Sequence, residues 1–290
     1  MASTLSSDAD ERPVAIVGAG TLGRRIAAVY AAGGSDVQIF DTSGEQCEAA
    51  NEYVADHLDE TRRILGLDGA RTGRVEVFDQ LASAVHGAWM VIEAVPERLD
   101  LKRQIFAQLD ELADADAILA SNSSSLPTSQ LIDGVKHPER VLNTHYQQPP
   151  ELNAVELMSS GETDESLIDA LMEKIPQYGL KPFRVRRESD GFIFNRVWAA
   201  IKRECLLVVA EGVATSEDFD EMWQIFRKPG IPPFRLMDRA GLDVLLNIEE
   251  HYALIRPHLP EEPRTLLREY VEQGKLGLKS GRGFYDDYSS

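Results

Sequence analysis

The chain has little positive charge, only two cysteines and no long apolar run. Its 290 residues include 30 basic and 48 acidic side chains, which leave a formal net charge of −18. This balance argues against nucleic-acid binding, because proteins that bind nucleic acids present a basic surface. No apolar stretch approaches the roughly 20 residues that a membrane-spanning helix needs, so we expect no membrane insertion.

Cysteine is too scarce and too scattered to organise the structure. Cys47 and Cys205 lie far apart in the sequence, and two cysteines alone form neither a zinc site nor a disulfide framework. We therefore expect no metal and take a reducing cytoplasm as the default location. Residues 1–12 are rich in serine and acidic residues and match neither a secretory signal nor a transit peptide, so they are interpreted as a short disordered arm.

A glycine motif follows the first apolar run, Val14–Val17. Gly18, Gly20 and Gly23, with Thr21 and Leu22 between them, form a Gly-x-Gly-x-x-Gly turn. In this motif the first glycine permits a tight turn, the second lets the backbone approach a pyrophosphate, and the third lets the next helix pack against the strand. A glycine-rich turn without a ligand is the alternative.

Asp41 ends the next apolar run, Val37–Phe40. A strand, a glycine turn, a helix over residues 24–32, a second strand and a carboxylate together make a dinucleotide-binding fingerprint. A carboxylate at this place accepts hydrogen bonds from ribose hydroxyls and repels a 2′-phosphate, so the sequence favours NAD over NADP. Arg24 and Arg25, at the helix start, are interpreted as surface residues.

The pattern of apolar runs divides the chain into two regions. The first alternates strands with amphipathic stretches, which is typical of a largely parallel sheet with helices on both faces. We expect strands at 14–17, 37–40, 75–78, 90–94, 117–120, 141–143, 154–158 and 183–185. From Asp190 onward the pattern is helical, with helices expected at 192–211, 216–226, 242–254 and 263–273. The prediction is an α/β fold: a Rossmann-type doubly wound sheet over 13–187, then a smaller all-α domain over 188–290.

Polar residues follow two of the expected strands, where ligands of open α/β sheets bind. Glu97 and Lys102 come after the strand at 90–94, either as a helix start or as a pair facing a cofactor. The run Ser121–Ser125 leaves the strand at 117–120, and its hydroxyls satisfy either the loop backbone or a polar ligand. Spacing alone leaves both alternatives open.

His145 and Glu156 form a third candidate group. His145 follows the strand at 141–143, and Glu156 lies among apolar residues of the next strand. A carboxylate in such surroundings needs a partner, and an imidazole is a suitable one. The carboxylate would fix the tautomer and leave the other ring nitrogen to remove a hydroxyl proton while a hydride leaves the same carbon. The alternative is a loop histidine and a solvent-facing glutamate.

Taken together, several segments resemble the L-3-hydroxyacyl-CoA dehydrogenase family along nearly the whole chain. They are VAIVGAGTLG, FDTS, VIEAVPERLDLK, ASNSSSLP, AVEL, DGFIFNR, IPPFRLMDRAGLD and KSGRGFY. The resemblance implies NAD-dependent interconversion of a 3-hydroxyacyl substrate and its 3-keto form, as in fatty acid metabolism. It also implies that the helical domain closes over the substrate and forms a homodimer.

The resemblance also implies roles for individual residues. His145 resembles the catalytic base and Glu156 its partner, while Ser124 and Asn195 match residues near the substrate. A helix cap is the alternative for Asn195. The implied cofactor contacts are Gly18, Gly20, Thr21, Leu22, Gly23, Asp41, Glu97, Lys102, Ser124, Gln148 and Lys279.

Two departures from the family pattern bear on the substrate. Gln148 stands where the family has the asparagine of His-x-x-Asn-Pro, and the following loop is one residue shorter. The stretch 45–65 is mostly acidic, whereas acyl-CoA members carry lysines there that hold the CoA nucleotide. The leading hypothesis is a 3-hydroxyacyl-CoA dehydrogenase. The alternatives are a dehydrogenase of a free hydroxy acid, as in the L-gulonate 3-dehydrogenase (lambda-crystallin) branch that residues 95–110 resemble, and a non-catalytic NAD-binding protein.

Overall fold

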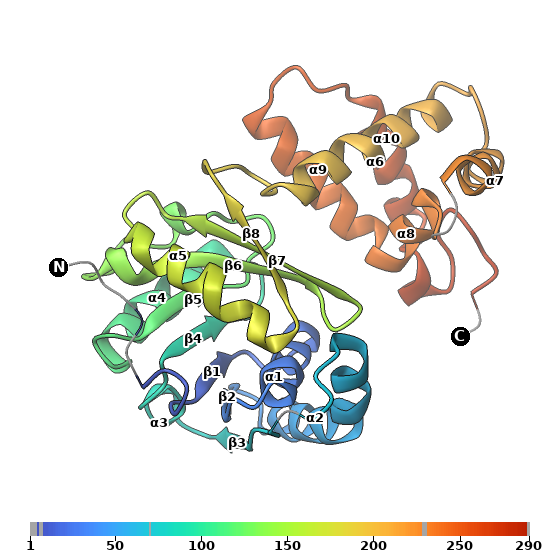
Figure 1. Ribbon diagram of the computed structural model, residues 1–290. Coiled ribbons are helices and arrows are strands. Elements are labelled where there is room, and N and C mark those ends of the chain that lie inside the picture. The colour runs from blue at the N-terminus through green and yellow to red at the C-terminus, as the bar shows by residue number, and fades with distance from the viewer. Residues whose placement is uncertain (1–4, 6–7, 70, 228–230, 289–290) are drawn as a thin grey trace. The chain divides into compact units, whose positions relative to one another are not determined.

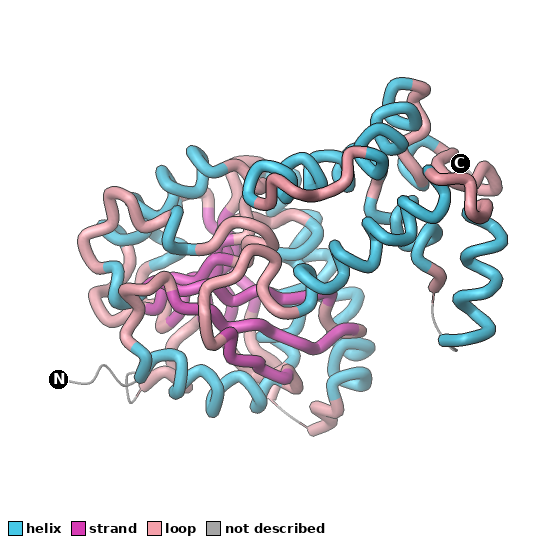
Figure 2. Tube along the Cα trace, turned by 90° about the horizontal axis from the view of Figure 1, so that it is seen from above, coloured by secondary structure: helices cyan, strands magenta, loops and turns pink. Residues whose placement is uncertain are grey.

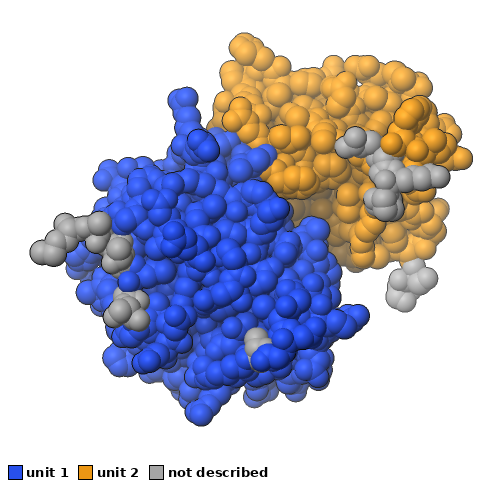
Figure 3. Space-filling model, viewed as in Figure 1, with its two compact units in different colours: residues 1–193 blue, residues 194–290 orange. Residues whose placement is uncertain are grey.

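The computed structural model describes residues 5, 8–69, 71–227 and 231–288. The chain divides into two compact units, Met1–Ile193 and Phe194–Ser290 (Figure 3). The first unit holds a β-sheet with its helices and the second is helical (Figure 1). The predicted fold class, a doubly wound α/β sheet followed by an all-α region, is confirmed.

One sheet of eight strands forms the centre of the first unit, in the order β3-β2-β1-β4-β5-β6-β7-β8. Neighbouring strands are parallel except β6 and β7, which form an antiparallel hairpin. The strand order reverses between β1 and β4, the place where open α/β sheets bind ligands. The strands are β1 (Val14–Val17), β2 (Val37–Phe40), β3 (Val75–Phe78), β4 (Met90–Glu93), β5 (Ile118–Ser121), β6 (Val141–Gln148), β7 (Leu152–Ser159) and β8 (Lys181–Val185).

Helices cover both faces of this sheet (Figure 2). Alternate residues of β1 enter different cores: Val14 and Ile16 pack with side chains of α1, α2 and α5, whereas Ala15 and Val17 pack with those of α3 and α4. Burial on both faces explains why the central strands are continuous apolar runs. The helices are α1 (Thr21–Ala32), α2 (Gly44–Leu65), α3 (Leu81–Val85), α4 (Leu99–Leu112) and α5 (Glu165–Lys174), with 3-10 turns at Thr128–Gln130, Pro138–Arg140 and Ile175–Tyr178.

The second unit has its own apolar core, to which Leu206, Phe234, Leu245 and Leu267 belong. The buried carboxylate of Asp238 accepts hydrogen bonds from the backbone of residues 284 and 285 and from the hydroxyl of residue 288, so it holds the C-terminal segment on the helices. The helices are α6 (Phe194–Ala210), α7 (Ser216–Arg227), α8 (Pro233–Ala240), α9 (Leu242–Ile255) and α10 (Glu262–Glu272), with a 3-10 turn at Leu278–Ser280.

Two expected boundaries differ from the structure in the region that carries the candidate site. Strand β6 does not end at residue 143: residues 144–148, interpreted as a loop, continue it and pair with β7. The helix expected from residue 192 begins at Phe194, because Phe192 has a φ of 55°, which lies outside the right-handed helical region.

Two further differences lie near the N-terminus and in the helical unit. Part of the arm predicted to be disordered is ordered: Ala9 is 4% exposed, and the guanidinium of Arg12 binds the carbonyl of Gly87 and the carboxylate of Asp116. Residues 1–4 and 6–7 of the arm lie outside the described residues. Helix α8 was not expected, although its Pro233 is a typical first helical residue.

Among the described helices, none combines the length and the apolar character needed to cross a membrane.

Candidate active site

The glycine turn after β1 has the shape that a pyrophosphate requires. A Cβ at Gly18, whose φ is 109°, would lie 2.6 Å from the carbonyl oxygen of Ala94, and one at Gly23 would lie 1.8 Å from the carbonyl oxygen of Gly18. Gly20 differs, because a Cβ there would meet no atom within 4 Å. Gly20 also caps α1, whose first turn, with Thr21 and Leu22, carries no acidic side chain. The positive end of the helix and the N–H groups of its first turn therefore meet no acidic side chain from that turn, and they suit an anionic group.

Asp41 lies beside this turn. Its Oδ2 accepts a hydrogen bond from the backbone N–H of Ala19 at 2.8 Å, and its Oδ1 accepts one from Ser43 at 2.9 Å. Each carboxylate oxygen has a second lone pair that can accept from a ribose hydroxyl. The turn and this carboxylate together fit an NAD adenosine and its pyrophosphate.

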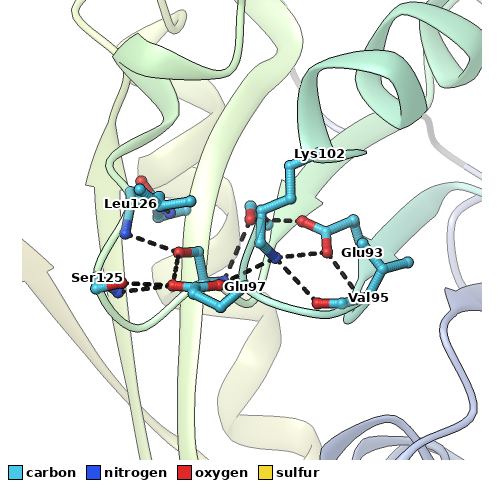
Figure 4. A network of polar contacts seen from close by, with 9 residues as sticks. Glu93, Val95, Glu97, Lys102, Ser125 and Leu126 are labelled. Carbon is cyan, nitrogen blue, oxygen red and sulfur yellow. Dashed lines mark hydrogen bonds and ion pairs between the residues drawn. The ribbon is translucent and has the colours of Figure 1, made fainter. Parts of the chain in front are cut away.

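A buried ionic group lies at the ends of β4 and β5 (Figure 4). The ammonium of Lys102 lies 2.7 Å from Oε1 of Glu93 and 3.2 Å from Oε2 of Glu97, and it donates to the carbonyl of Val95. Glu93 is fully buried and also accepts from the hydroxyl of Ser121 at 2.7 Å. Because the Lys102 side chain is only 1% exposed, the structure places its ammonium inside this group, and Glu97 is the member that reaches solvent.

Glu97 holds the serine run in place. Its Oε1 accepts hydrogen bonds from the hydroxyl of Ser123 at 2.5 Å and from the hydroxyl and backbone N–H of Ser125. Burial raises the pKa of Glu97, but the charge of Lys102 and these hydrogen bonds outweigh it and leave the pKa below its ordinary value. Ser124 lies exposed between the two bound serines. The structure gives its hydroxyl no partner within the described residues, so that group is available to a ligand.

His145 and Glu156 stand directly opposite each other in the β6–β7 hairpin. The Nδ1 atom of the imidazole lies 2.8 Å from Oε2 of the carboxylate, and the residues are 4% and 2% exposed. Opposite residues of an antiparallel pair share a face of the sheet, so the hairpin register alone brings the two groups together. Since the carboxylate can only accept, Nδ1 carries the proton and Nε2 is left as an acceptor. Nε2 has no partner among the described residues.

The segment between the sheet and α6 lies over this pair and was not anticipated as part of the site. The ring of Phe192 stacks on the imidazole of His145, with centroids 4.9 Å apart and planes at 28°. The backbone N–H of Ile193 donates to Oε1 of Glu156 at 2.8 Å. The left-handed backbone of Phe192 is uncommon for a bulky residue. The preceding glycine was the only local signal for this turn.

Gln147 is a second residue that sequence reasoning missed. Its side-chain amide donates to Oε2 of Glu156 at 3.0 Å and lies 3.4 Å from Nδ1 of His145. Alternate residues of a strand share a face, so a strand that continued past residue 143 would have predicted this contact.

Arg25 is likewise more than a surface residue. From the first turns of α1, its guanidinium donates to the carbonyl of Pro149 at 3.0 Å and to the carboxylate of Glu151 at 2.8 Å. It thus ties the glycine-turn helix to the tip of the β6–β7 hairpin. Arg24 instead lies over the ring of Tyr53, 5.0 Å from its centroid.

The remaining predicted residues do not meet these groups in the contacts that the structure shows. Gln148 ends β6, is exposed and pairs through its backbone with Leu152. Asn195 is the second residue of α6, and Lys279 forms an ion pair with Asp243 at the start of α9. Both belong to the helical unit, and their contacts with substrate and cofactor stay predictions.

Comparison with known proteins shows which family the chain is similar to. Residues 13–189 match the family model described as 3-hydroxyacyl-CoA dehydrogenase, NAD binding domain, and residues 191–287 match its C-terminal domain. The chain belongs to the 3-hydroxyacyl-CoA dehydrogenase family. The predicted family and the predicted cofactor, NAD, are therefore confirmed, and the dehydrogenase family accounts for both units of the chain.

Relatives of this dehydrogenase family align over nearly the whole chain. A 3-hydroxybutyryl-CoA dehydrogenase of Mycobacterium tuberculosis is 35% identical over 295 residues, which cover 96% of this chain and 99% of the relative. A 5-formyl-3-hydroxy-2-methylpyridine 4-carboxylate 5-dehydrogenase of Mesorhizobium japonicum is 32% identical, with 94% and 90% covered. The crystal structure of (S)-3-hydroxybutyryl-CoA dehydrogenase from Ralstonia eutropha superposes with a TM-score of 0.84 at 30% identity, with 96% and 99% covered. By their names, these relatives include both CoA and non-CoA enzymes.

Proposed function

We propose that the protein is an NAD-dependent dehydrogenase that interconverts a 3-hydroxyacyl compound and its 3-keto form, with His145 as the general base. The observation that carries this proposal is the imidazole whose Nδ1 is held by Glu156 at 2.8 Å, while Nε2 has no partner within the described residues. When bound, NAD supplies the nicotinamide ring that accepts the hydride from the carbinol carbon. The hydroxyl proton passes to Nε2 of His145.

The residues around His145 fit this role. Glu156 is buried and accepts the Nδ1 proton, so it holds the ring orientation and stabilises the imidazolium that forms when Nε2 takes a proton. In the reverse direction the imidazolium donates that proton to the ketone oxygen. The exposed hydroxyl of Ser124 is proposed as a second donor to the same oxygen, and Asn195 as a further contact to the substrate.

The first candidate substrate is a 3-hydroxyacyl-CoA thioester, as the names of several relatives suggest. The charge of α2 favours a second candidate, a hydroxy acid without CoA. This helix carries acidic residues along its length, and the basic residues of its last turn are Arg62 and Arg63. An acidic helix offers little attraction to the phosphates of a CoA nucleotide. The Mesorhizobium relative, which by its name acts on a pyridine carboxylate, supports the same alternative.

A substrate panel tests the proposal. The protein is incubated with NAD and (S)-3-hydroxybutyryl-CoA, (S)-3-hydroxybutyrate or its methyl ester, and NADH formation is followed by absorbance. Oxidation of the thioester alone supports the first candidate, and oxidation of the free acid supports the second. Tight NAD binding without turnover of any member contradicts both and favours the non-catalytic alternative. Replacing NAD with NADP is the matched control, since Asp41 disfavours a 2′-phosphate.

We further propose that a second copy of the chain covers part of the helical unit. Large apolar side chains of this unit are strongly exposed: Val213 70%, Met222 56%, Ile225 64%, Phe226 77% and Leu254 83%. Large apolar side chains that a second copy could bury are a feature of protein interfaces. Light scattering coupled to gel filtration is expected to give twice the 32.2 kDa mass of one chain; the mass of a single chain contradicts the proposal.

A further inference from the structure

Gln147 is a second donor on the carboxylate that holds His145. Its Nε2 lies 3.0 Å from Oε2 of Glu156, the same oxygen that accepts from the imidazole at 2.8 Å. Because a carboxylate only accepts, the nitrogen end of the amide must face it. Two N–H donors therefore converge on one oxygen, and the amide nitrogen lies 3.4 Å from Nδ1.

The hairpin explains why Gln147 reaches this position. His145 and Gln147 are two residues apart on β6 and share a face. The register of β6 with β7 shifts between Tyr146 and Gln148, so Gln147 has no residue directly opposite in the ladder. Its side chain instead reaches back to the Glu156 carboxylate. Gln148, which stands where the family resemblance places an asparagine, is exposed at the end of the strand.

We infer that Gln147 is a positioning residue that lowers the basicity of His145 by sharing the Glu156 carboxylate. A hydrogen bond from the amide uses part of the negative charge that would otherwise stabilise the imidazolium. The positive end of the amide dipole also lies beside Nδ1 and opposes a charge on the ring. Both effects have the same sign, so the amide of Gln147 opposes the positive charge that the ring acquires when it takes up a proton. The inference rests on the proposed role of His145 as base.

Three basic side chains of the elements around the hairpin have partners of their own. On β8, Arg184 pairs with carboxylates of α5, and Lys181 lies over the ring of Phe183. On α1, Arg25 binds the hairpin tip. Tyr146 points to the opposite face, where its hydroxyl bonds to that of a buried tyrosine of α1.

Asp190, in the segment before α6, precedes Phe192 by two residues and is half-buried. From that segment, the Phe192 ring contacts the imidazole and the Ile193 N–H donates to the carboxylate. The amide of Gln147 is a side-chain donor to Glu156, and one substitution removes it without altering the backbone or the imidazole.

The test is the pH profile of kcat/KM for Gln147→Met, which keeps the side-chain length and removes the donor. We expect the acid limb to move to higher pH by about half a unit, because the hydrogen bond is made to Glu156 and only part of its effect reaches the ring. At a fixed pH on that limb, kcat/KM then falls about threefold, while the high-pH plateau and the KM for NAD change less than about twofold. Gln108→Met, in an exposed position of α4, is the matched control and leaves the profile unchanged.

A second measurement does not depend on turnover. The chain has six histidines, so ring-labelled histidine gives a small set of NMR signals, and His145→Gln identifies the one of interest. Its titration midpoint is expected to move upward in Gln147→Met and in Gln147→Asn, whose amide is one methylene shorter. Superimposable titrations, or an activity loss of equal size at every pH, overturn the inference. If the wild-type protein oxidises no substrate, the proposed function is contradicted. The NMR titration still tests the effect of Gln147 on His145 in that case, because it needs no turnover.

Discussion

The first unit contains two buried polar groups, and they differ in how completely their hydrogen-bonding atoms are satisfied. In the first, Lys102 is enclosed by Glu93, Glu97 and a backbone carbonyl, and both carboxylates receive further hydrogen bonds. In the second, one imidazole nitrogen of His145 is bound by Glu156, and the other has no partner within the described residues. Burial is common to both, so burial alone does not indicate chemistry. The two groups differ in the acceptor, Nε2, that the second leaves over after its internal contacts.

The two groups also arise from different parts of the topology. The first, which we call the closed group, consists of Glu93, Glu97 and Lys102. It joins the ends of the parallel strands β4 and β5 to the first turns of α4, and it fixes the serine run. The second, which we call the open group, consists of His145 and Glu156. It lies within an antiparallel hairpin, where the cross-strand register places one side chain opposite the other. We infer that the closed group shapes the site while the open group carries out the proton transfer.

The largest expected effect comes from the open group. In His145→Gln we expect kcat to fall about a thousandfold, within the range that a general base contributes, because no other described side chain replaces Nε2. NAD affinity, measured by titration calorimetry, is expected to stay within about twofold, since the glycine turn and Asp41 are untouched. Turnover near the wild-type rate contradicts the role of this residue.

A change in the closed group is expected to act on stability. Lys102→Met leaves Glu93 fully buried without its cation, and breaking a buried ion pair in this way costs about 3 kcal/mol of unfolding free energy. Urea unfolding followed by circular dichroism measures the loss. Lys136→Met, which breaks an exposed ion pair with Glu111, is the control and should cost less than about 0.5 kcal/mol. A loss no larger than this control would show that the closed group is not structural.

The sequence indicated Glu97 and Lys102 as candidates but did not predict their arrangement. Apolar runs and the glycine motif located the strands and the turn because these signals are local. Lys102 lies in an amphipathic helix, where a charged residue reads as solvent-exposed, and its burial depends on Glu93 and Ser121 from neighbouring strands. Contacts between strands distant in the sequence leave no local periodicity.

The open group shows a second reason why the sequence did not predict how the site residues are arranged. His145 and Glu156 were recognised as candidates by residue type, but Thr144–Gln148 is too polar to read as a strand, so the register that pairs them was missed. Gln147 then could not be placed on the same face. Apart from the preceding glycine, no pattern in the segment indicates the positive φ of Phe192 or the contact of its ring with His145.

A smaller effect is expected where the glycine-turn helix meets the hairpin. Arg25→Ala removes the hydrogen bond to the Pro149 carbonyl and the ion pair with Glu151. A lost hydrogen bond of this kind corresponds to about 1 kcal/mol, so we expect kcat/KM to fall about fivefold as the hairpin loosens. Steady-state kinetics measure this loss. The control is Arg63→Ala, which removes an exposed arginine at the end of α2. It shows how much of the loss comes from the removal of positive charge alone. Equal kcat/KM values for the two variants would show that the contacts of Arg25 do not support the site.

The smallest expected effect is the pH dependence of the stability that Glu97 contributes. Although burial opposes it, the charge of Lys102 and the serine hydrogen bonds keep the pKa of Glu97 below its ordinary value in the folded protein. Its contribution to stability is therefore present above the unfolded pKa of about 4.3 and is lost as the pH falls through the folded value.

Urea midpoints of wild type and Glu97→Gln should thus differ at neutral pH and converge in acid, with a modest difference because the Glu97 side chain is 36% exposed. Glu76→Gln, at an exposed position of β3, is the control and should show no such convergence. A difference between wild type and Glu97→Gln that persists unchanged into acid would mean that the carboxylate's charge is not what holds the serine run. Because this loss is confined to acid, a change in the catalytic pH profile at higher pH belongs to the open group and not to the closed one.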